Sequence, residues 1–370
     1  MKSITLPALL RAALAVLTLT VAASAQRLVD ARDALSSFPD SQAVLFVNAR
    51  RITTQALPRL LPKVEYDKLI TQSRQMGFDV RDIDYVALGA RFTDPSQPSG
   101  IPEVLLVVHG QFSSDALLEL ARAAAPTLNL SPNEEVYQGK TMQVFDLTRL
   151  TPPPAAGDTA PPQPPSLPFK EIAAVALDAN TLVVGVPGYV RAAVDASVGQ
   201  GRLKPSLLEL AAGDPHTLWS LTADLPPNLT EYLQRMGMPK NEEVERIAGW
   251  LRQVSYSNGM DALNFTMRAA ILTDNPEHAS AISGLVRMWM TAFETTAQQE
   301  VAKKRRKPAE AREAQILLRA IRSHTNETEG STVILGTSLP QTALAEIVRK
   351  GLAKKPPVPT RPRRRATRRR

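Results

Sequence analysis

Residues that could support metal or acid–base chemistry are few and widely spaced. The chain has 370 residues and no cysteine, which excludes thiol nucleophiles and cysteine-ligated metal sites. Metal sites need two or three converging ligands, often four residues apart on a helix, and the histidines lack that spacing. These histidines are His109, His216, His278 and His324. We therefore predict no metal and no other cofactor, and we expect each histidine to be a surface or hydrogen-bonded structural residue.

Motifs for phosphate binding and nucleophilic catalysis are incomplete. Gly139-Lys140-Thr141 resembles the end of a phosphate-binding loop, but Glu134 occupies the position of the first glycine in that motif. The sequence contains no Gly-x-Ser-x-Gly elbow and no Ser-x-x-Lys pair at a helix start, so no catalytic residue is predicted. A serine triad can assemble from distant positions, which leaves an enzyme open as an alternative.

Residues 1–25 have the pattern of a secretory signal peptide. Lys2 and Arg11 are the positive flank of an apolar stretch, and Ala23-Ser24-Ala25 is a small-residue cleavage site. We expect cleavage between Ala25 and Gln26 and export to the periplasm or the exterior. The apolar stretch is shorter than the ~20 residues of a spanning helix, although an uncleaved anchor remains the alternative. No later segment approaches that length, so no transmembrane span is expected after processing.

The basic charge of the chain is concentrated at its C-terminus. The formal net charge is +8; without Lys2 and Arg11 it is +6, and without the nine cations of residues 354–370 it is −3. The body of the protein is therefore mildly acidic, which argues against a basic fold that coats nucleic acid. The nine tail cations are Lys354, Lys355, Arg361, Arg363, Arg364, Arg365, Arg368, Arg369 and Arg370.

The composition of this tail predicts a disordered segment that binds anionic surfaces. It is rich in proline and has no aromatic residue. Each basic residue near an anionic lipid surface contributes ~1 kcal/mol, so the expected partner is an anionic envelope component: phospholipid, lipopolysaccharide or acidic polysaccharide. Without aromatic residues to stack on bases, sequence-specific nucleic-acid binding is not expected. The alternatives are nonspecific binding of polyanions or nucleic acid, and a tail that only increases solubility.

The segment around Met288-Trp289-Met290 is the densest cluster of large apolar residues. An apolar stripe at helical spacing predicts a buried helix face formed by Ile282, Leu285, Val286, Trp289 and Phe293. Met288 and Met290 lie off that stripe and, if exposed, would form an adaptable surface for a peptide or a lipid. The basic run 303–307 after this helix is either a solvated segment or a second anionic contact.

Hydrophobic patterns predict an α+β fold of two tandem, duplicated domains, each a mostly antiparallel sheet with helices on one face. We expect a first domain over residues 26–203, containing a proline-rich loop at 152–168, and a second domain over 204–353. The expected strands are 43–49, 84–92, 103–111, a hairpin at 136–147, 171–177, 181–186, 217–223, 254–263, 265–272 and 332–337. Duplication is suggested because a Thr-initiated strand, a glycine, a proline and a helix follow Thr181 and Thr332 alike.

The start of the mature chain carries a family resemblance. The sequences FPDSQAVLFVNARRI and ALPRLLP resemble those of uncharacterised exported bacterial proteins of the acidobacterial type, which have no assigned activity. This resemblance implies export and transfers no site residue. Together these features predict an exported, non-enzymatic envelope protein that binds or scaffolds, with the tail directed to anionic surfaces. The alternatives are a hydrolase-type enzyme with a site between the two halves, and nonspecific polyanion or nucleic-acid binding through the tail.

Overall fold

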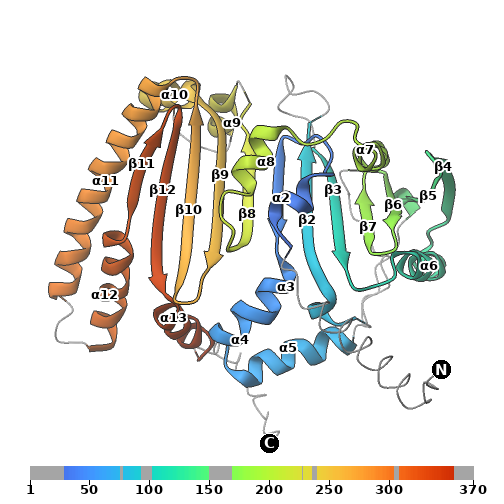
Figure 1. The fold of residues 1–370 in the computed structure, drawn as a ribbon, viewed down its shortest axis with the longest axis horizontal. Helices are drawn as coiled ribbons and strands as arrows, with labels where there is room; N and C mark the ends of the chain where they lie inside the picture. Colours follow the sequence, from blue (N-terminus) through green and yellow to red (C-terminus); the bar gives the residue numbers. More distant parts are fainter. Residues whose placement is uncertain are drawn as a thin grey trace, which may run out of the picture.

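The structure is a computed structural model, and it describes residues 29–75, 78–92, 102–149, 169–226, 228–235, 240–303 and 308–353. The signal peptide with its cleavage site, the proline-rich segment 152–168 and the tail 354–370 lie outside these ranges. The described residues combine helices with a large antiparallel sheet, which confirms the predicted α+β class (Figure 1).

Twelve strands form one sheet in the order β11-β12-β10-β9-β8-β1-β2-β3-β7-β6-β5-β4. Every pairing within it is antiparallel. The strands are β1 (Ala43–Val47), β2 (Ile83–Arg91), β3 (Glu103–Gly110), β4 (Pro132–Tyr137), β5 (Lys140–Asp146), β6 (Glu171–Asp178), β7 (Thr181–Gly185), β8 (Thr217–Asp224), β9 (Leu251–Met260), β10 (Asn264–Thr273), β11 (Thr325–Glu329) and β12 (Thr332–Pro340).

Turn residues explain where several strands end. The predicted hairpin at 136–147 is β4–β5, and its two connecting residues, Gln138 and Gly139, have φ values of 46° and 75°. A two-residue turn with positive φ at both positions matches the right-handed twist of the flanking strands, and glycine adopts it without strain. β11 was not predicted because its sequence, TNETE, lacks the apolar alternation of a half-buried strand.

Helices lie against both faces of this sheet. Ser113 caps α6 by accepting a hydrogen bond from the backbone of Ala116, and Pro187 occupies the first turn of α7. The helices are α2 (Ala31–Leu35), α3 (Ala49–Arg51), α4 (Leu57–Leu60), α5 (Lys63–Gln75), α6 (Ser114–Ala124), α7 (Pro187–Ser197), α8 (Pro205–Ala211), α9 (Leu229–Arg235), α10 (Glu242–Trp250), α11 (Pro276–Lys303), α12 (Pro308–Arg322) and α13 (Gln341–Ala353), with a π-helical segment at Ile52–Ala56 between α3 and α4.

The two halves of the chain meet at β1 and β8, which pair over Ala43–Val47 and make the sheet continuous. Outward from this junction the first half runs β1-β2-β3-β7-β6 and the second runs β8-β9-β10-β12-β11. With the β4–β5 hairpin set aside, both halves place their strands in the same order. An internal repeat requires that order, and the repeat itself stays a prediction.

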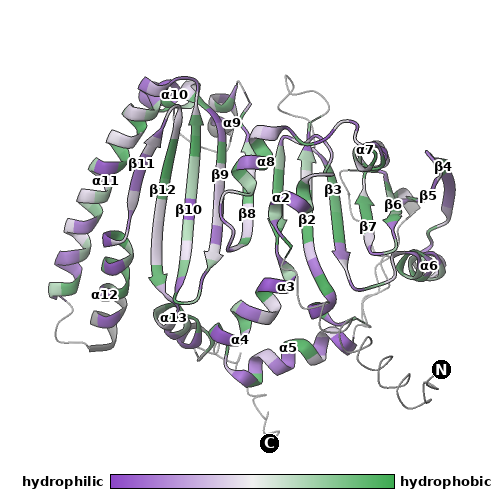
Figure 2. Cartoon of the chain, viewed as in Figure 1, coloured by the Kyte–Doolittle hydropathy of each residue, from purple (hydrophilic) through white to green (hydrophobic). Residues whose placement is uncertain are grey.

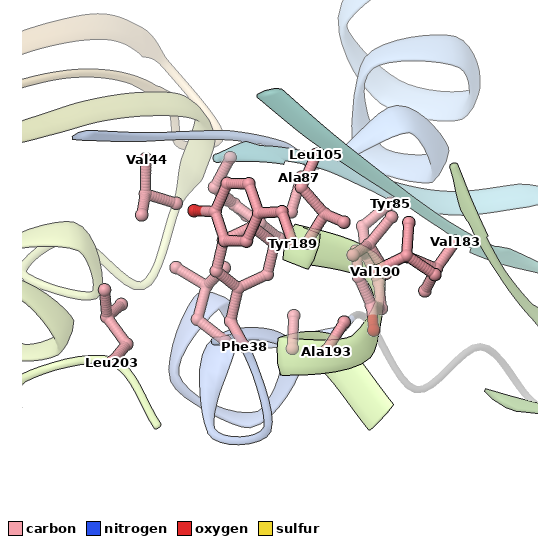
Figure 3. Close-up of a cluster of buried hydrophobic side chains, with 14 of the residues drawn as sticks. Phe38, Val44, Tyr85, Ala87, Leu105, Val183, Tyr189, Val190, Ala193 and Leu203 are labelled. Atoms are coloured by element: carbon pink, nitrogen blue, oxygen red, sulfur yellow. The ribbon is translucent and has the colours of Figure 1, made fainter. Parts of the chain in front are cut away.

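The main hydrophobic core lies on the face of the sheet that carries α2, α7 and α8. Tyr189 and Phe38 are buried at its centre, packed over strand residues such as Val44, Ala87 and Leu105 (Figure 3). The Tyr189 hydroxyl is hydrogen-bonded to Ser41. A Cβ atom at Gly89 would lie 2.6 Å from the Tyr189 hydroxyl oxygen and 2.8 Å from the Phe38 ring, so the aromatic side chains occupy the space that glycine leaves. Leu207 and Ala211 of α8 belong to this core, which therefore crosses the predicted boundary at residue 203.

The opposite face of the sheet carries three smaller clusters. One lies under α6 at Phe145 and Ala174, and a second lies under the α3–α4 segment at Leu218 and Met260. The third lies under α11, where Ile282 packs against strand residues including Val333, Ile271 and Leu335. The middle of this face lies between the three clusters and belongs to none of them.

Candidate functional site

The predicted site residues fall outside the described part of the chain. This holds for the signal cleavage site at Ala25 and Gln26 and for the nine tail cations from Lys354 to Arg370. Anionic-surface binding by the tail stays a prediction. Within the described ranges, two features could carry function: an apolar helical hairpin and a polar cluster around His109.

α11 and α12 form a hairpin at the β11 end of the sheet (Figure 1). An apolar groove lies between the two helices. The groove has a volume of about 480 Å³. Trp289 and Phe293, one helical turn apart on α11, are 56% and 59% exposed, and Leu317 on α12 is exposed as well. The residues lining the groove are Met290, Phe293, Thr296, Ala297, Glu300, Ala314, Leu317 and Ile321.

This exposure corrects part of the predicted core stripe. Ile282 is buried and Val286 packs against the α11 cluster as expected, but Trp289 and Phe293 are exposed. Met288, which was expected to form a surface only if exposed, is 59% exposed. Sequence reasoning also missed the contribution of α12, although Ala314, Leu317 and Ile321 repeat at helical spacing.

The physical reason is the length of α11 relative to the strands beneath it. Its 28 residues make a helix of ~42 Å, whereas the five residues of the neighbouring edge strand β11 span ~17 Å, and Trp289 lies ~20 Å from the start of α11. The first half of α11 packs on strand residues, and the second half lies beside α12. Figure 2 shows hydrophobic residues along α12 as well as on α11. An exposed apolar groove of this kind marks a surface for binding a protein, a membrane or a ligand.

The hairpin sequence is also basic. Residues 276–322 contain nine cations and five anions, a formal net charge of +4. Some of these charges are paired within the hairpin: Arg322 Nε lies 2.9 Å from Glu294 Oε1, and this contact lowers the pKa of Glu294. The basic run 303–307 joins the two helices, and only Lys303 of this run lies in the described ranges. The groove is thus lined mainly by apolar residues, and it belongs to a segment of the sequence with a net positive charge.

A partly exposed polar cluster is the other candidate, beside a cavity of about 450 Å³ between α2, α7 and the sheet. His109 Nδ1 lies 3.0 Å from Thr181 Oγ1, and Thr181 Oγ1 donates to Asp178 Oδ2 at 2.8 Å. On the other side of the ring, His109 Nε2 lies 3.6 Å from Asp84 Oδ2, and Asp84 Oδ1 lies 2.5 Å from Arg50 Nη2.

The direction of these hydrogen bonds makes the cluster a poor nucleophile–base pair. The proton of the Thr181 hydroxyl is directed to Asp178, so Thr181 accepts from the Nδ1–H of His109. A nucleophilic hydroxyl donates to its base instead. The Tyr85 ring stacks on His109 at 5.2 Å between centroids, and burial raises the pKa of Tyr85 to about 12, which keeps its phenol protonated. We read the cluster as a structural polar network.

The remaining histidines lie apart from one another. The His278 ring stacks on Trp250 at 4.2 Å and bonds Asp274 Oδ1 at 2.6 Å, which lowers the pKa of Asp274. His324 lies between α12 and β11, and His216 precedes β8. Among the described residues, no group of three His, Asp or Glu side chains is arranged to hold a metal ion.

No helix in the ranges that the structure covers is both long and apolar enough to cross a membrane.

Comparisons with known proteins find distant structural similarity. No family model matches the chain, and no curated protein matches it. Three crystal forms of TP0453 are similar at low level. Form III is 10% identical with a TM-score of 0.38 and covers 85% of this chain and 97% of that one. Form IV is 9% identical with a TM-score of 0.41, covering 85% and 95%, and form I is 9% identical with 0.37, covering 85% and 96%. Scores this low carry no functional inference.

Proposed function

We propose that the protein is an exported, non-enzymatic envelope protein that binds anionic membrane surfaces through the α11–α12 hairpin. The observation that carries this function is the exposure of Phe293 and Leu317, which line an apolar groove, and of Trp289 one helical turn before Phe293, in a hairpin of net charge +4. Amphipathic helices with Trp, Phe and Leu on one side and Lys or Arg on the other lie in the membrane interface, with their apolar side ~5–10 Å deep.

A membrane is favoured over a peptide as the binding partner because the hairpin sequence is basic, through the run 303–307 that joins α11 and α12. Anionic lipids attract basic segments by ~1 kcal/mol for each cation near the surface. The hairpin has four more cations than anions, and the tail adds nine cations with no acid. Stable anchoring of a peripheral protein takes two such signals, and the apolar hairpin and the basic tail would be these two.

The test is flotation of the full chain with vesicles of phosphatidylglycerol and phosphatidylcholine, compared with vesicles of phosphatidylcholine alone. Replacing both aromatic residues, Trp289→Ser with Phe293→Ser, is expected to weaken binding at least ten-fold at low and at high salt. A matched control replaces two remote exposed residues, Val64→Ser with Val136→Ser, and should change binding less than two-fold.

A variant that ends at Ala353 lacks the basic tail and so tests the hairpin separately from the tail. It should lose affinity mainly at low salt, because electrostatic attraction by the tail is screened as salt rises. Unchanged binding by the double aromatic variant would overturn attachment through the hairpin. Complete loss of binding on removal of the tail, with no effect of the aromatic pair, would assign the attachment to the tail alone.

A further inference from the structure

A row of apolar side chains crosses the middle of the sheet on the face opposite the main core. Leu45 of β1 pairs directly with Leu88 of β2 and with Leu221 of β8. Leu221 in turn pairs with Tyr256 of β9, and Leu88 pairs with Leu106 of β3. Since directly paired residues of antiparallel strands share a face, these five side chains form one line, here called the central row.

The rows on either side of the central row are apolar as well. Residues two positions along each strand share the same face. One neighbouring row contains Val254, Ala223, Ala43, Ala90 and Val104, and the other contains Asn258, Trp219, Val47, Val86 and Val108. None of these fifteen residues is charged, and the Tyr256 hydroxyl donates to Asn258 Oδ1 at 3.3 Å within the same surface. Figure 2 shows hydrophobic stretches on β2, β3 and β8.

Large side chains in the central row are open to solvent. Leu221 is 46% exposed, Leu88 is 39% exposed and Tyr256 is 37% exposed. The hydrophobic clusters of this face lie around them: under α6 toward β5–β7, under the α3–α4 segment, and under α11 toward β10 and β12. Burying such side chains from water is favourable by about 25 cal/mol for each Å² of apolar area, so this surface favours an apolar occupant.

We propose that the central row binds the acyl chain of a single lipid molecule. Its five strands, about 4.8 Å apart, span ~19 Å, and an acyl chain that fills one leaflet of a ~30 Å hydrocarbon core is ~15 Å long. An acyl chain has no hydrogen-bonding groups. Placing it on this face, which has almost no hydrogen-bonding side chains, therefore leaves no polar group without a partner. A peptide laid there would bury backbone N–H and C=O groups without partners, which is unfavourable.

A second copy of the chain fits this face poorly. Two sheets that pack face to face approach to ~10 Å. The helices bordering the central row rise from the same face, and an α-helix with its side chains is itself ~10–12 Å across. Two copies would collide through α6 and α11 before their central rows came into contact. Acyl-chain binding here is independent of membrane attachment by the α11–α12 hairpin, because the two surfaces share no residue.

The first experiment titrates the full chain with cis-parinaric acid, a long-chain fatty acid whose fluorescence rises in an apolar site. Saturable binding of one molecule per chain is expected, at least ten-fold weaker in Leu221→Glu and in Leu88→Ser. Val136→Glu is the matched control, since Val136 is an exposed apolar residue of the same sheet on the edge strand β4, and it should bind normally. The hairpin pair Trp289→Ser with Phe293→Ser should also bind normally, which keeps failure here distinct from failure of membrane attachment.

The second experiment leaves the central row intact and so does not depend on how its variants fold. Trp250→Phe with Trp289→Phe leaves Trp219 as the single tryptophan, and its ring centroid lies 5.3 Å from that of Tyr256. A brominated fatty acid should quench Trp219 saturably, at the concentrations that displace cis-parinaric acid. Absence of saturable quenching overturns acyl-chain binding at this site. A dimer that sedimentation detects in the full chain and that Leu221→Glu dissociates would assign the face to a second copy instead.

Discussion

Helices α7 and α11 have similar sequence features, but the aromatic residue of α7 is buried and the Trp and Phe residues of α11 are exposed. Each comes soon after a strand, carries a proline in its first turn and repeats large apolar residues at helical spacing. All 11 residues of α7 lie over the sheet, where Tyr189 and Val190 are fully buried. α11 extends beyond the neighbouring strand β11, and its Trp289 and Phe293 are exposed. An amphipathic pattern thus says which residues share a face, and the extent of the neighbouring sheet decides whether that face is covered.

The largest effect that separates these helices should come from truncating one aromatic residue in each. Tyr189→Ala removes a fully buried ring from the centre of the main core, and we expect the free energy of unfolding to fall by about 3–5 kcal/mol. Trp289→Ala should change it by no more than about 0.5 kcal/mol, because more than half of that side chain is in water. Urea denaturation followed by circular dichroism measures both. Equal losses would contradict the exposure of the second half of α11.

Adding a single methyl group beside each helix sharpens the contrast. Gly89→Ala places a Cβ atom against Tyr189 and Phe38, and overpacking of this kind should destabilise the protein by about 1–3 kcal/mol. Gly284→Ala, on α11, meets no atom within 4 Å and should stabilise the helix by up to about 1 kcal/mol. Opposite signs in urea denaturation are the expected result, whereas a stabilising Gly89→Ala would mean that the α7 contact is loose.

The smallest expected effect concerns His324, which lies in the connection between α12 and β11. Burial lowers the pKa of His324, and its Nε2 atom is buried without a hydrogen-bond partner. The unfolded chain therefore takes up a proton more readily than the folded chain, so stability is complete above the unfolded pKa near 6.5 and falls as the pH drops below it.

Replacing this histidine by an amide isolates its contribution. His324→Gln should reduce the loss of unfolding free energy between about pH 7.5 and 5.5, measured as the shift of the urea midpoint. The double mutant with Trp289→Ala should show the same reduction, since Trp289 lies on α11 and His324 lies between α12 and β11. An unchanged pH dependence in His324→Gln would mean that other groups control it.

Much of the local structure could be predicted from the residues alone. The turn at Gly139, the cap at Ser113 and the proline start of α7 follow from backbone preferences that act within a few residues. Strand β11 escaped prediction because its place depends on pairing with β12 and not on its own apolar residues.

The candidate surfaces were less accessible to prediction. The residues of α11 were singled out as an apolar cluster, but their exposure depends on how far the neighbouring strand β11 extends. The central row could not be seen at all, because Leu45, Leu88 and Leu221 are brought into line by the pairing of β1 with both β2 and β8, across up to 176 positions of sequence.

The sequence by itself determined the α+β class, the positions of most strands and turns, and the segregation of basic charge into the last residues of the chain. These properties follow from side-chain chemistry and from dihedral preferences of neighbouring residues. Only the tertiary structure decided that two halves share one sheet, that Trp289 faces water while Tyr189 does not, and that one apolar face stays open. The reason is that coverage of a face depends on contacts between distant segments, and periodicity along the chain carries no information about what those segments leave bare.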